Sequence, residues 1–173
     1  PGRTLNDVRA ILAAVPLARH VTAEVNLQTG GRLFFQGRST WSQPRGVLPA
    51  TFAMDRIVVA EGRGISDFDL EMQTQVIVLG SSVVRSLFAR GLDPLDRVLT
   101  LNGQPFTVIG VLPEYTTHGD DDSIGERNYS VFIPLTTAQT LFRTDEKVDV
   151  LSVQLADIQD MPVALQQITN VLT

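Results

Sequence analysis

An acidic cluster in the second half of the chain offers the residue types that bind a hard cation. Asp120, Asp121 and Asp122 are contiguous, and Glu126 and Asn128 follow within a few positions. Carboxylate and amide oxygens are ligands that calcium takes in proteins, but an EF-hand loop needs acidic groups at alternate positions around a central glycine. Neighbouring side chains in a contiguous run diverge. The pattern therefore favours a solvated acidic loop tip, and we expect no bound metal.

Neither of the two histidines has a partner that would complete a catalytic or metal-binding group. His20 lies at the start of a predicted strand and His118 in the polar loop. Neither therefore has a second histidine or a carboxylate three or four residues away on a predicted helix, where that spacing would place two ligands side by side. The chain has no cysteine, which excludes thiolate ligands and thiol nucleophiles. A hydrolase or metal-dependent enzyme using Asp120, Asp122 and His118 is therefore the least favoured alternative, and we expect neither enzymatic activity nor a cofactor.

A strand–turn–helix pattern around Gly80 is similar to an anion-binding site. The apolar run 76–79 leads into Gly80, Ser81 and Ser82 and then into a helical pattern, and helix N-termini can bind phosphate. The glycine-rich sequences of nucleotide-binding loops are absent, and so is the Gly-x-Ser-x-Gly turn of a nucleophilic serine. We interpret Gly80 as a tight turn and Ser81 or Ser82 as the cap of the helix.

The composition is that of a folded domain and disfavours nucleic acid as a partner. Of the 173 residues, 43% are hydrophobic and 19% are charged, and the formal net charge is −5. A phosphate backbone or an anionic lipid surface binds clustered Lys and Arg. No apolar run approaches the roughly 20 residues that span a bilayer. We expect this chain to be a piece of a longer protein whose membrane helices lie outside it.

Helices and hairpin-linked strands are interspersed along the chain, which predicts an α+β fold. Strict apolar–polar alternation predicts a strand at 21–28, a turn at 29–31 and a returning strand at 32–38. A further strand at 42–49 contains Pro44, a residue typical of an edge strand or a bulge. These elements predict a hairpin-rich N-terminal part.

The second half of the chain predicts another set of elements. The run 76–79 is apolar on both faces, as in a buried strand, and the helix after it extends to Gly91. Asn102-Gly103 between two alternating runs is the strongest short signal for a hairpin. A polar loop at 113–128, strands at 129–133 and 148–155, and helices at 137–142 and after Asp160 complete the prediction.

These elements predict two lobes. Residues 1–60 and 146–173 form a discontinuous α/β lobe from both chain ends, and residues 61–145 form an inserted mixed lobe. The break falls at Gly62 and Gly64, because glycine adopts backbone angles that other residues avoid. There Arg63 and Asp69, with Asp67 nearby, are predicted to form a charge pair that orders the boundary.

Short motifs follow one another along nearly the whole chain. They are residues 3–7, Gly46-Val47-Leu48-Pro49, Gly62-Arg63 with Ile65 and Asp69, residues 76–80, Leu87-Phe88, Asp93-Pro94-Leu95, residues 106–112 and residues 131–137. Their order and spacing resemble the periplasmic core domain of MacB-type (FtsX-like) ABC-transporter permeases. The family's glycine after the Asp-Pro-hydrophobic motif is replaced by Asp96, and aspartate tolerates unusual backbone angles better than most residues.

The resemblance implies a part of a membrane machine. The outer lobe would be porter-like, and the inserted lobe would resemble the one often called the Sabre. Such a domain relays ATP-driven motion in efflux, lipoprotein extraction or mechanotransmission, while ATP is hydrolysed in the cytosol. The implied partners are a second permease copy, the cytosolic ATPase reached through membrane helices, and a periplasmic adaptor or lipoprotein. The domain would lie at the extracytoplasmic, periplasmic face of the inner (cell) membrane, within a membrane-embedded protein.

Two segments are the candidate contact surfaces for these partners, since a loop as long as 113–128 usually has a function. In the region 32–41, burial of Phe34, Phe35 and Trp41 in the core is favoured over exposure at an interface. The predicted contact residues are Arg32, Phe34, Arg38, Tyr115, His118, Asp120, Asp121, Asp122 and Arg127. The alternative function is a free-standing extracytoplasmic binding protein for a peptide or lipoprotein.

Overall fold

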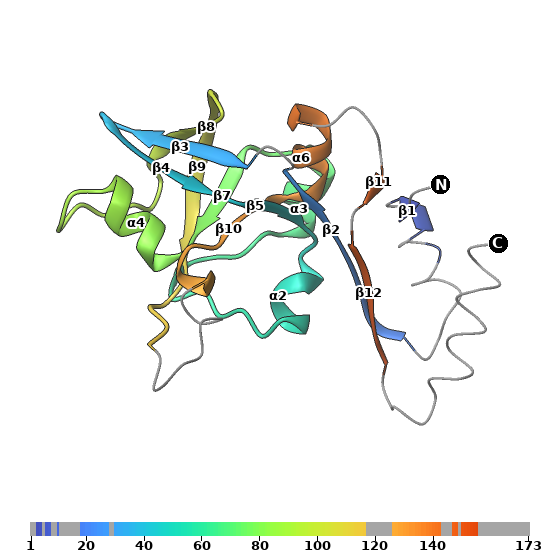
Figure 1. Ribbon diagram of the computed structural model, residues 1–173. Coiled ribbons are helices and arrows are strands. Elements are labelled where there is room, and N and C mark those ends of the chain that lie inside the picture. Colours follow the sequence, from blue (N-terminus) through green and yellow to red (C-terminus); the bar gives the residue numbers. More distant parts are fainter. Residues whose placement is uncertain are drawn as a thin grey trace.

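A mixed β-sheet forms the centre of the molecule in the computed structural model (Figure 1). The structure describes residues 3–4, 6–7, 10, 18–27, 30–116, 126–142, 147–148 and 150–155. The strands of the sheet are β2 (Ala18–Asn26), β3 (Gly31–Phe35), β4 (Arg38–Ser42), β5 (Pro44–Val47), β6 (Glu61–Gly62), β7 (Val76–Leu79), β8 (Val98–Leu101), β9 (Gln104–Val111), β10 (Val131–Pro134) and β12 (Val150–Leu155). A separate short ladder pairs β1 (Arg3–Thr4) with β11 (Lys147–Val148).

The hydrogen-bonded order of the sheet is β12-β2-β5-β10-β7-β9-β8-β3-β4, and β6 pairs with β9 beside this path. Four described helices are α2 (Ala50–Met54), α3 (Asp67–Met72), α4 (Ser81–Leu87) and α6 (Leu135–Phe142). The predicted α+β class is confirmed. Within the described ranges, no helix is long and apolar enough to cross a membrane.

Both faces of the central strands are covered, which explains their apolar sequences. On β7, Ile77 and Leu79 belong to a large core that includes Val83 of α4 and Leu135 of α6. Val78 points to the other face and joins a smaller core, against which Phe52 of α2 packs. Strands buried on both sides lose the alternation of half-buried strands, so the prediction of a buried strand at 76–79 is confirmed.

The hairpin predicted at Asn102-Gly103 is also confirmed. These two residues have φ angles of 50° and 84°, as a type I′ turn requires. The register pairs Leu101 with Gln104 across the turn. The left-handed backbone at both positions explains why this dipeptide is so strong a local signal.

The predicted hairpin between 21–28 and 32–38 is wrong. β2 pairs with β5 and β12, whereas β3 pairs with β4 and β8. The chain turns later, at Gln36 and Gly37, whose φ angles are 46° and 80°. The Gly30-Gly31 pair is the more obvious turn signal in the sequence, and it led the prediction to close the hairpin one strand too early.

The edge position expected for Pro44 is wrong as well. β5 lies inside the sheet, antiparallel to β2 and parallel to β10. Pro44 is nevertheless the first residue of β5, a position where a missing backbone N–H is tolerated. Both parts of the proposed two-lobe division contribute strands to the sheet, and the lobe boundaries at 60 and 146 remain a proposal.

Candidate functional site

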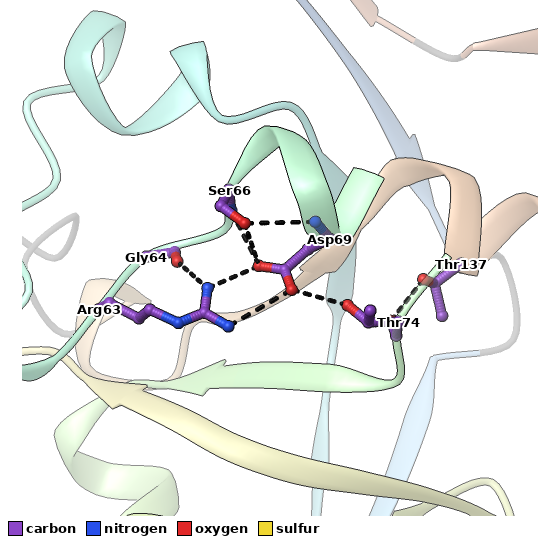
Figure 2. A network of polar contacts seen from close by, with 6 residues as sticks. All are labelled: Arg63, Gly64, Ser66, Asp69, Thr74 and Thr137. Atoms are coloured by element: carbon purple, nitrogen blue, oxygen red, sulfur yellow. Dashed lines mark hydrogen bonds and ion pairs between the residues drawn. The ribbon is translucent and has the colours of Figure 1, made fainter. Parts of the chain in front are cut away.

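The charge pair predicted at the lobe boundary is present. Arg63 Nη1 lies 2.6 Å from Asp69 Oδ2, and the Asp69 residue is only 1% exposed. Ser66 precedes α3 and forms a capping box with Asp69. The backbone N–H and the hydroxyl of Ser66 each donate to Asp69 Oδ2 at 2.9 Å. In return, the backbone N–H of Asp69 donates to Ser66 Oγ at 3.2 Å. Thr74 Oγ1 donates to Asp69 Oδ1 at 2.8 Å (Figure 2). The buried carboxylate is thus surrounded by donors.

These donors keep Asp69 ionised. Burial by itself raises the pKa of this carboxyl, but hydrogen bonds from Arg63, Ser66 and Thr74 outweigh burial and lower the pKa from 3.8 to about 2. Hydrogen bonds that favour the charged form act in this direction. A carboxylate with such a low pKa and fully engaged oxygens is a poor proton acceptor, so the network serves structure and not acid–base chemistry.

The network also fastens α3 to α6. Thr137 Oγ1 donates to the backbone carbonyl of Thr74 at 2.7 Å, as Figure 2 shows beside the Asp69 carboxylate. Thr136 Oγ1 donates to the carbonyl of Leu70. We call this group of residues, Arg63, Ser66, Asp69, Thr74 and Thr137, the Asp69 clamp.

A second feature is an open groove at the end of β4. We call it the β4 groove; its volume is about 840 Å3. Its lining comes from two segments far apart in the sequence: Trp41, Ser42, Gln43, Arg45, Glu126, Arg127, Tyr129 and Ser130. Ser42 Oγ donates to the carbonyl of Tyr129 at 3.1 Å, which joins the strand end to the turn that follows the helical residues 126–128.

Two arginines, with Ser130, line both the β4 groove and a smaller pocket of about 170 Å3. The Arg45 guanidinium lies 5.2 Å from the Phe132 ring centroid and pairs with Glu24 and Asp55. The Arg127 guanidinium lies 5.5 Å from the Tyr115 ring centroid and donates to the Asp55 carbonyl at 3.3 Å. Stacking and hydrogen bonds hold both cations in place.

Five of the predicted contact residues lie within the described part of the chain, and two of these line a pocket. Arg32, Phe34 and Arg38 are exposed on β3 and β4, and Tyr115 and Arg127 line the smaller pocket. The others, His118, Asp120, Asp121 and Asp122, lie outside the described residues. Whether any of the nine contacts a partner remains a proposal.

The expected burial of the aromatic residues is right for one of the three. Phe35 is buried, with its ring centroid 4.5 Å from that of Phe88. Phe34 is 46% exposed and Trp41 is 65% exposed, so the prediction is wrong for both. The register explains this, because Phe34 and Trp41 lie on the same face of the β3–β4 hairpin, whereas Phe35 points to the core with Phe88.

Asn128 is a structural residue that the sequence did not reveal. Its side-chain oxygen accepts from the backbone N–H of Tyr115 at 2.9 Å, and its amide donates to the Tyr115 carbonyl at 2.9 Å. The two ends of the 113–128 segment are thus joined at their base. An asparagine in a polar loop gives no signal of this role, since such residues are usually solvated.

The interpretation of Ser81 or Ser82 as a helix cap is wrong. Gly80 is the N-cap of α4 and no side chain caps it; the helix ends at Leu87 and not near Gly91. Ser81 Oγ instead bonds Asn128 Oδ1 at 3.1 Å. A Cβ at Gly80 would stand 2.3 Å from the Asn128 carbonyl oxygen, so glycine is required by this close approach.

No group of three or more metal-ligating side chains occurs among the described residues. These residues instead form a continuous sheet with an exposed hairpin and a groove.

The fold is that of extracytoplasmic domains from ABC-type transporters. The extracellular domain of the noncanonic ABC-type transporter YknZ from Gram-positive bacteria superposes with a TM-score of 0.80 at 19% identity, over 99% of this chain and 82% of that one. The periplasmic region of MacB from Actinobacillus actinomycetemcomitans also gives 0.80, at 21% identity, over 99% of this chain and 74% of that one. At these identities the likeness establishes the fold.

The chain belongs to the MacB-like periplasmic core domain family, whose model matches residues 1–171. The macrolide export ATP-binding/permease protein MacB of Hahella chejuensis is 30% identical over 90% of this chain and 20% of its own length. The protein of the same name from Mannheimia succiniciproducens is 26% identical over 98% of this chain and 25% of its own length. The chain therefore spans only a fifth to a quarter of these relatives.

Proposed function

We propose that this domain relays ATP-driven motion from a membrane-embedded ABC permease to partners on the extracytoplasmic side. Membership of the MacB-like periplasmic core domain family supports the setting. The ATP-hydrolysing part would be a separate cytosolic domain or subunit, connected through membrane helices. The domain itself would change no covalent bond.

The continuity of the sheet is the observation that carries this proposal. A relay must move without deforming, and cross-strand hydrogen bonds with packed side chains resist deformation. The strand path runs unbroken from β12 to β4, and apolar cores cover both faces of its middle. The Asp69 clamp adds a polar connection between α3 and α6. A displacement applied near β12 would then reach the β3–β4 hairpin.

The proposed partners are a second copy of the permease and a periplasmic adaptor or lipoprotein. The relatives are named for macrolide export, which makes efflux one candidate activity for the parent transporter. Lipoprotein extraction and mechanotransmission are the other two. All three candidate activities require the relay of motion, and they differ in which partner the extracytoplasmic end of the domain binds.

A crosslinking experiment in the parent transporter tests the relay. If the movement of the domain is a step of the ATP hydrolysis cycle, a restraint that blocks this movement should slow the cycle, because conformational steps can limit turnover. A cysteine at the exposed position Arg38 (Arg38→Cys) would be joined between the two copies with crosslinkers of increasing length. The shortest linkers should slow hydrolysis several-fold, and cleaving the linker should restore it.

The control is the same cysteine capped with a small reagent. Hydrolysis that is indifferent to every linker length would contradict the relay. So would the absence of crosslinking between copies at any length, because the proposal places two copies of the domain near each other.

The open β4 groove favours a second candidate, a free-standing binding protein. Reading the gene on both sides of this chain separates the two functions. Membrane-spanning apolar runs on both flanks support the permease, whereas a signal peptide with an early stop codon supports the binding protein.

A further inference from the structure

We propose that the outer edge of β4 binds an extended acidic peptide segment as an added strand, with one end of the segment in the β4 groove. This goes beyond the proposed function, because a relay of motion requires no peptide site. The partner is defined by its chemistry: an unfolded or loop segment with alternating apolar and acidic residues.

The backbone of β4 offers unpaired hydrogen-bonding groups at this edge. β4 is the last strand of the sheet, and β3 is its only partner among the strands that the structure describes. Phe35 pairs with Arg38 next to the turn. In a two-residue hairpin this closing pair is hydrogen-bonded. Because hydrogen-bonded and non-hydrogen-bonded pairs alternate along an antiparallel ladder, the N–H and C=O of Ser39 and Trp41 point away from β3.

Arg32 confirms this alternation from the other strand. It lies opposite Trp41 in the register. Its backbone N–H donates to Asn102 Oδ1 at 2.8 Å, and its carbonyl accepts from the Asn102 N–H at 2.9 Å. Both of its backbone groups therefore point toward β8 and away from β4. Ser39 and Trp41 accordingly present two donors and two acceptors to an incoming strand.

Aromatic side chains border this edge where a bound peptide would lie. Trp41 is 65% exposed and Tyr129 is 55% exposed, and both line the β4 groove. Phe34 on the adjacent strand is 46% exposed. Exposed aromatic rings beside a free strand edge are the features with which sheets capture peptides: main-chain bonds give affinity, and side-chain contacts give specificity.

The local charge selects an acidic segment. The whole chain carries a net charge of −5, yet Arg32 lies opposite Trp41 on β3 and Arg127 lines the groove. Arg38 begins β4, on the other face of the hairpin. None of the three forms an ion pair with a carboxylate among the described residues, whereas Arg45 is already paired with Glu24 and Asp55. Glu126 is the one carboxylate among the groove-lining residues given above. A basic patch on an acidic domain attracts acidic ligands.

The same charges disfavour a second copy of this chain as the occupant. Pairing two β4 edges would place Arg38 of both copies in one ladder, with Arg32 of each copy one strand away on β3. Like charges close together across strands are destabilising. An acidic peptide avoids this repulsion and neutralises the arginines.

A fluorescence titration tests the proposal, since Trp41 is the only tryptophan of the chain. The probe is a synthetic nine-residue peptide that alternates valine and glutamate, and its control has lysine in place of every glutamate. The acidic peptide should shift the Trp41 emission and saturate. Its affinity should fall about tenfold between about 50 mM and about 300 mM salt, because exposed charges are screened. The lysine peptide should bind at least about tenfold more weakly.

A matched pair of variants tests the backbone contact. Ser39→Pro removes the outward N–H but no bond to β3, a placement that edge strands tolerate. Ser39→Ala keeps the N–H. We expect Ser39→Pro to weaken binding of the acidic peptide about tenfold and Ser39→Ala to weaken it less than about twofold. Should Ser39→Pro not fold, N-methylation of alternate peptide residues removes the same hydrogen bonds from the ligand side and must weaken binding equally.

Three results would overturn the proposal. They are equal binding of the acidic and lysine peptides, equal binding of the N-methylated and unmodified peptides, and a Trp41 emission that changes with protein concentration alone. The last result would assign the β4 edge to a second copy of the chain. None of these outcomes bears on the crosslinking experiment, so the two proposals fail independently.

Discussion

Replacing Asp69 with asparagine should remove much of the stability of the domain. The side chains have nearly the same shape, so the substitution removes the charge and leaves the packing almost unchanged. Asp69 is 1% exposed and accepts from Arg63, from Ser66 twice and from Thr74. A hydrogen bond to a charged group contributes about 1.5–3 kcal/mol net of exchange with water. The contributions around one carboxylate do not add, because burial of its charge opposes them. We expect Asp69→Asn to lower the free energy of unfolding by about 2–3 kcal/mol.

The pH dependence gives an independent check on this magnitude. The pKa of Asp69 is 3.8 in the ordinary case and about 2 in the fold, a difference that corresponds to about 2 kcal/mol. Because the folded pKa is the lower one, this stability is fully present above about pH 4 and is lost as the pH falls through about 2. The difference in free energy of unfolding between the wild type and Asp69→Asn should therefore decrease as the pH falls from about 4 to about 2.

Urea unfolding followed by far-ultraviolet circular dichroism measures both quantities. For a chain of this size, a loss of about 2–3 kcal/mol lowers the Tm by roughly 5–10 °C. Asp67→Asn is the matched control, because Asp67 is exposed in the same helical turn; it should change stability by less than about 0.5 kcal/mol. The reasoning is refuted if both variants behave alike, or if the Asp69→Asn difference is the same at pH 7 and near pH 2.

Other substitutions test the remaining parts of the structure by thermal unfolding and amide exchange. Gly80→Ala places a Cβ 2.3 Å from the Asn128 carbonyl oxygen and should lower the free energy of unfolding by about 2–3 kcal/mol. Gly103→Ala meets open space but has a φ of 84°, and should lower it by about 1 kcal/mol. Equal losses would contradict the close approach at Gly80. Asp96 has a φ of 64°, so Asp96→Gly should raise stability by about 0.5–1 kcal/mol, and a loss of stability would show that its side chain matters more than its backbone. Asn128→Ala should speed exchange of the Tyr115 amide at least about tenfold; unchanged exchange would mean that the 113–128 base is held by other contacts.

Local signals in the sequence predicted the elements whose cause is local. Asn102-Gly103 turns the chain because both residues adopt left-handed backbone angles, and the apolar run of β7 requires burial on both faces. The Arg63–Asp69 pair was also predictable, because opposite charges close in sequence flank a helix start. The family motifs placed these pieces in order, including Asp96 at a left-handed position that usually holds glycine.

Long-range pairing was not predictable from the same signals. Nothing in the alternation of β2 indicates that its partners are β5 and β12 and not the next strand. The exposure of Phe34 and Trp41 depends on which face of the β3–β4 hairpin is covered by helices. No local pattern in the sequence indicates that face. Asn128 acts through a bond to Tyr115 thirteen residues away, across a segment whose polarity suggests only solvent. Partner strands and loop closures are decided by the whole fold.

A distance measurement between spin labels tests the relay most directly. The chain has no cysteine, so labels at the exposed positions Arg38→Cys and Glu71→Cys report on this domain in a parent transporter from which any other cysteines have been removed. On addition of ATP, the distance between these two positions within one domain should change by less than about 2 Å, while the distance between the two copies of position 38 shifts by more, as in rigid-body movement. A large change within the domain, or a fixed distance between the copies, would contradict the account.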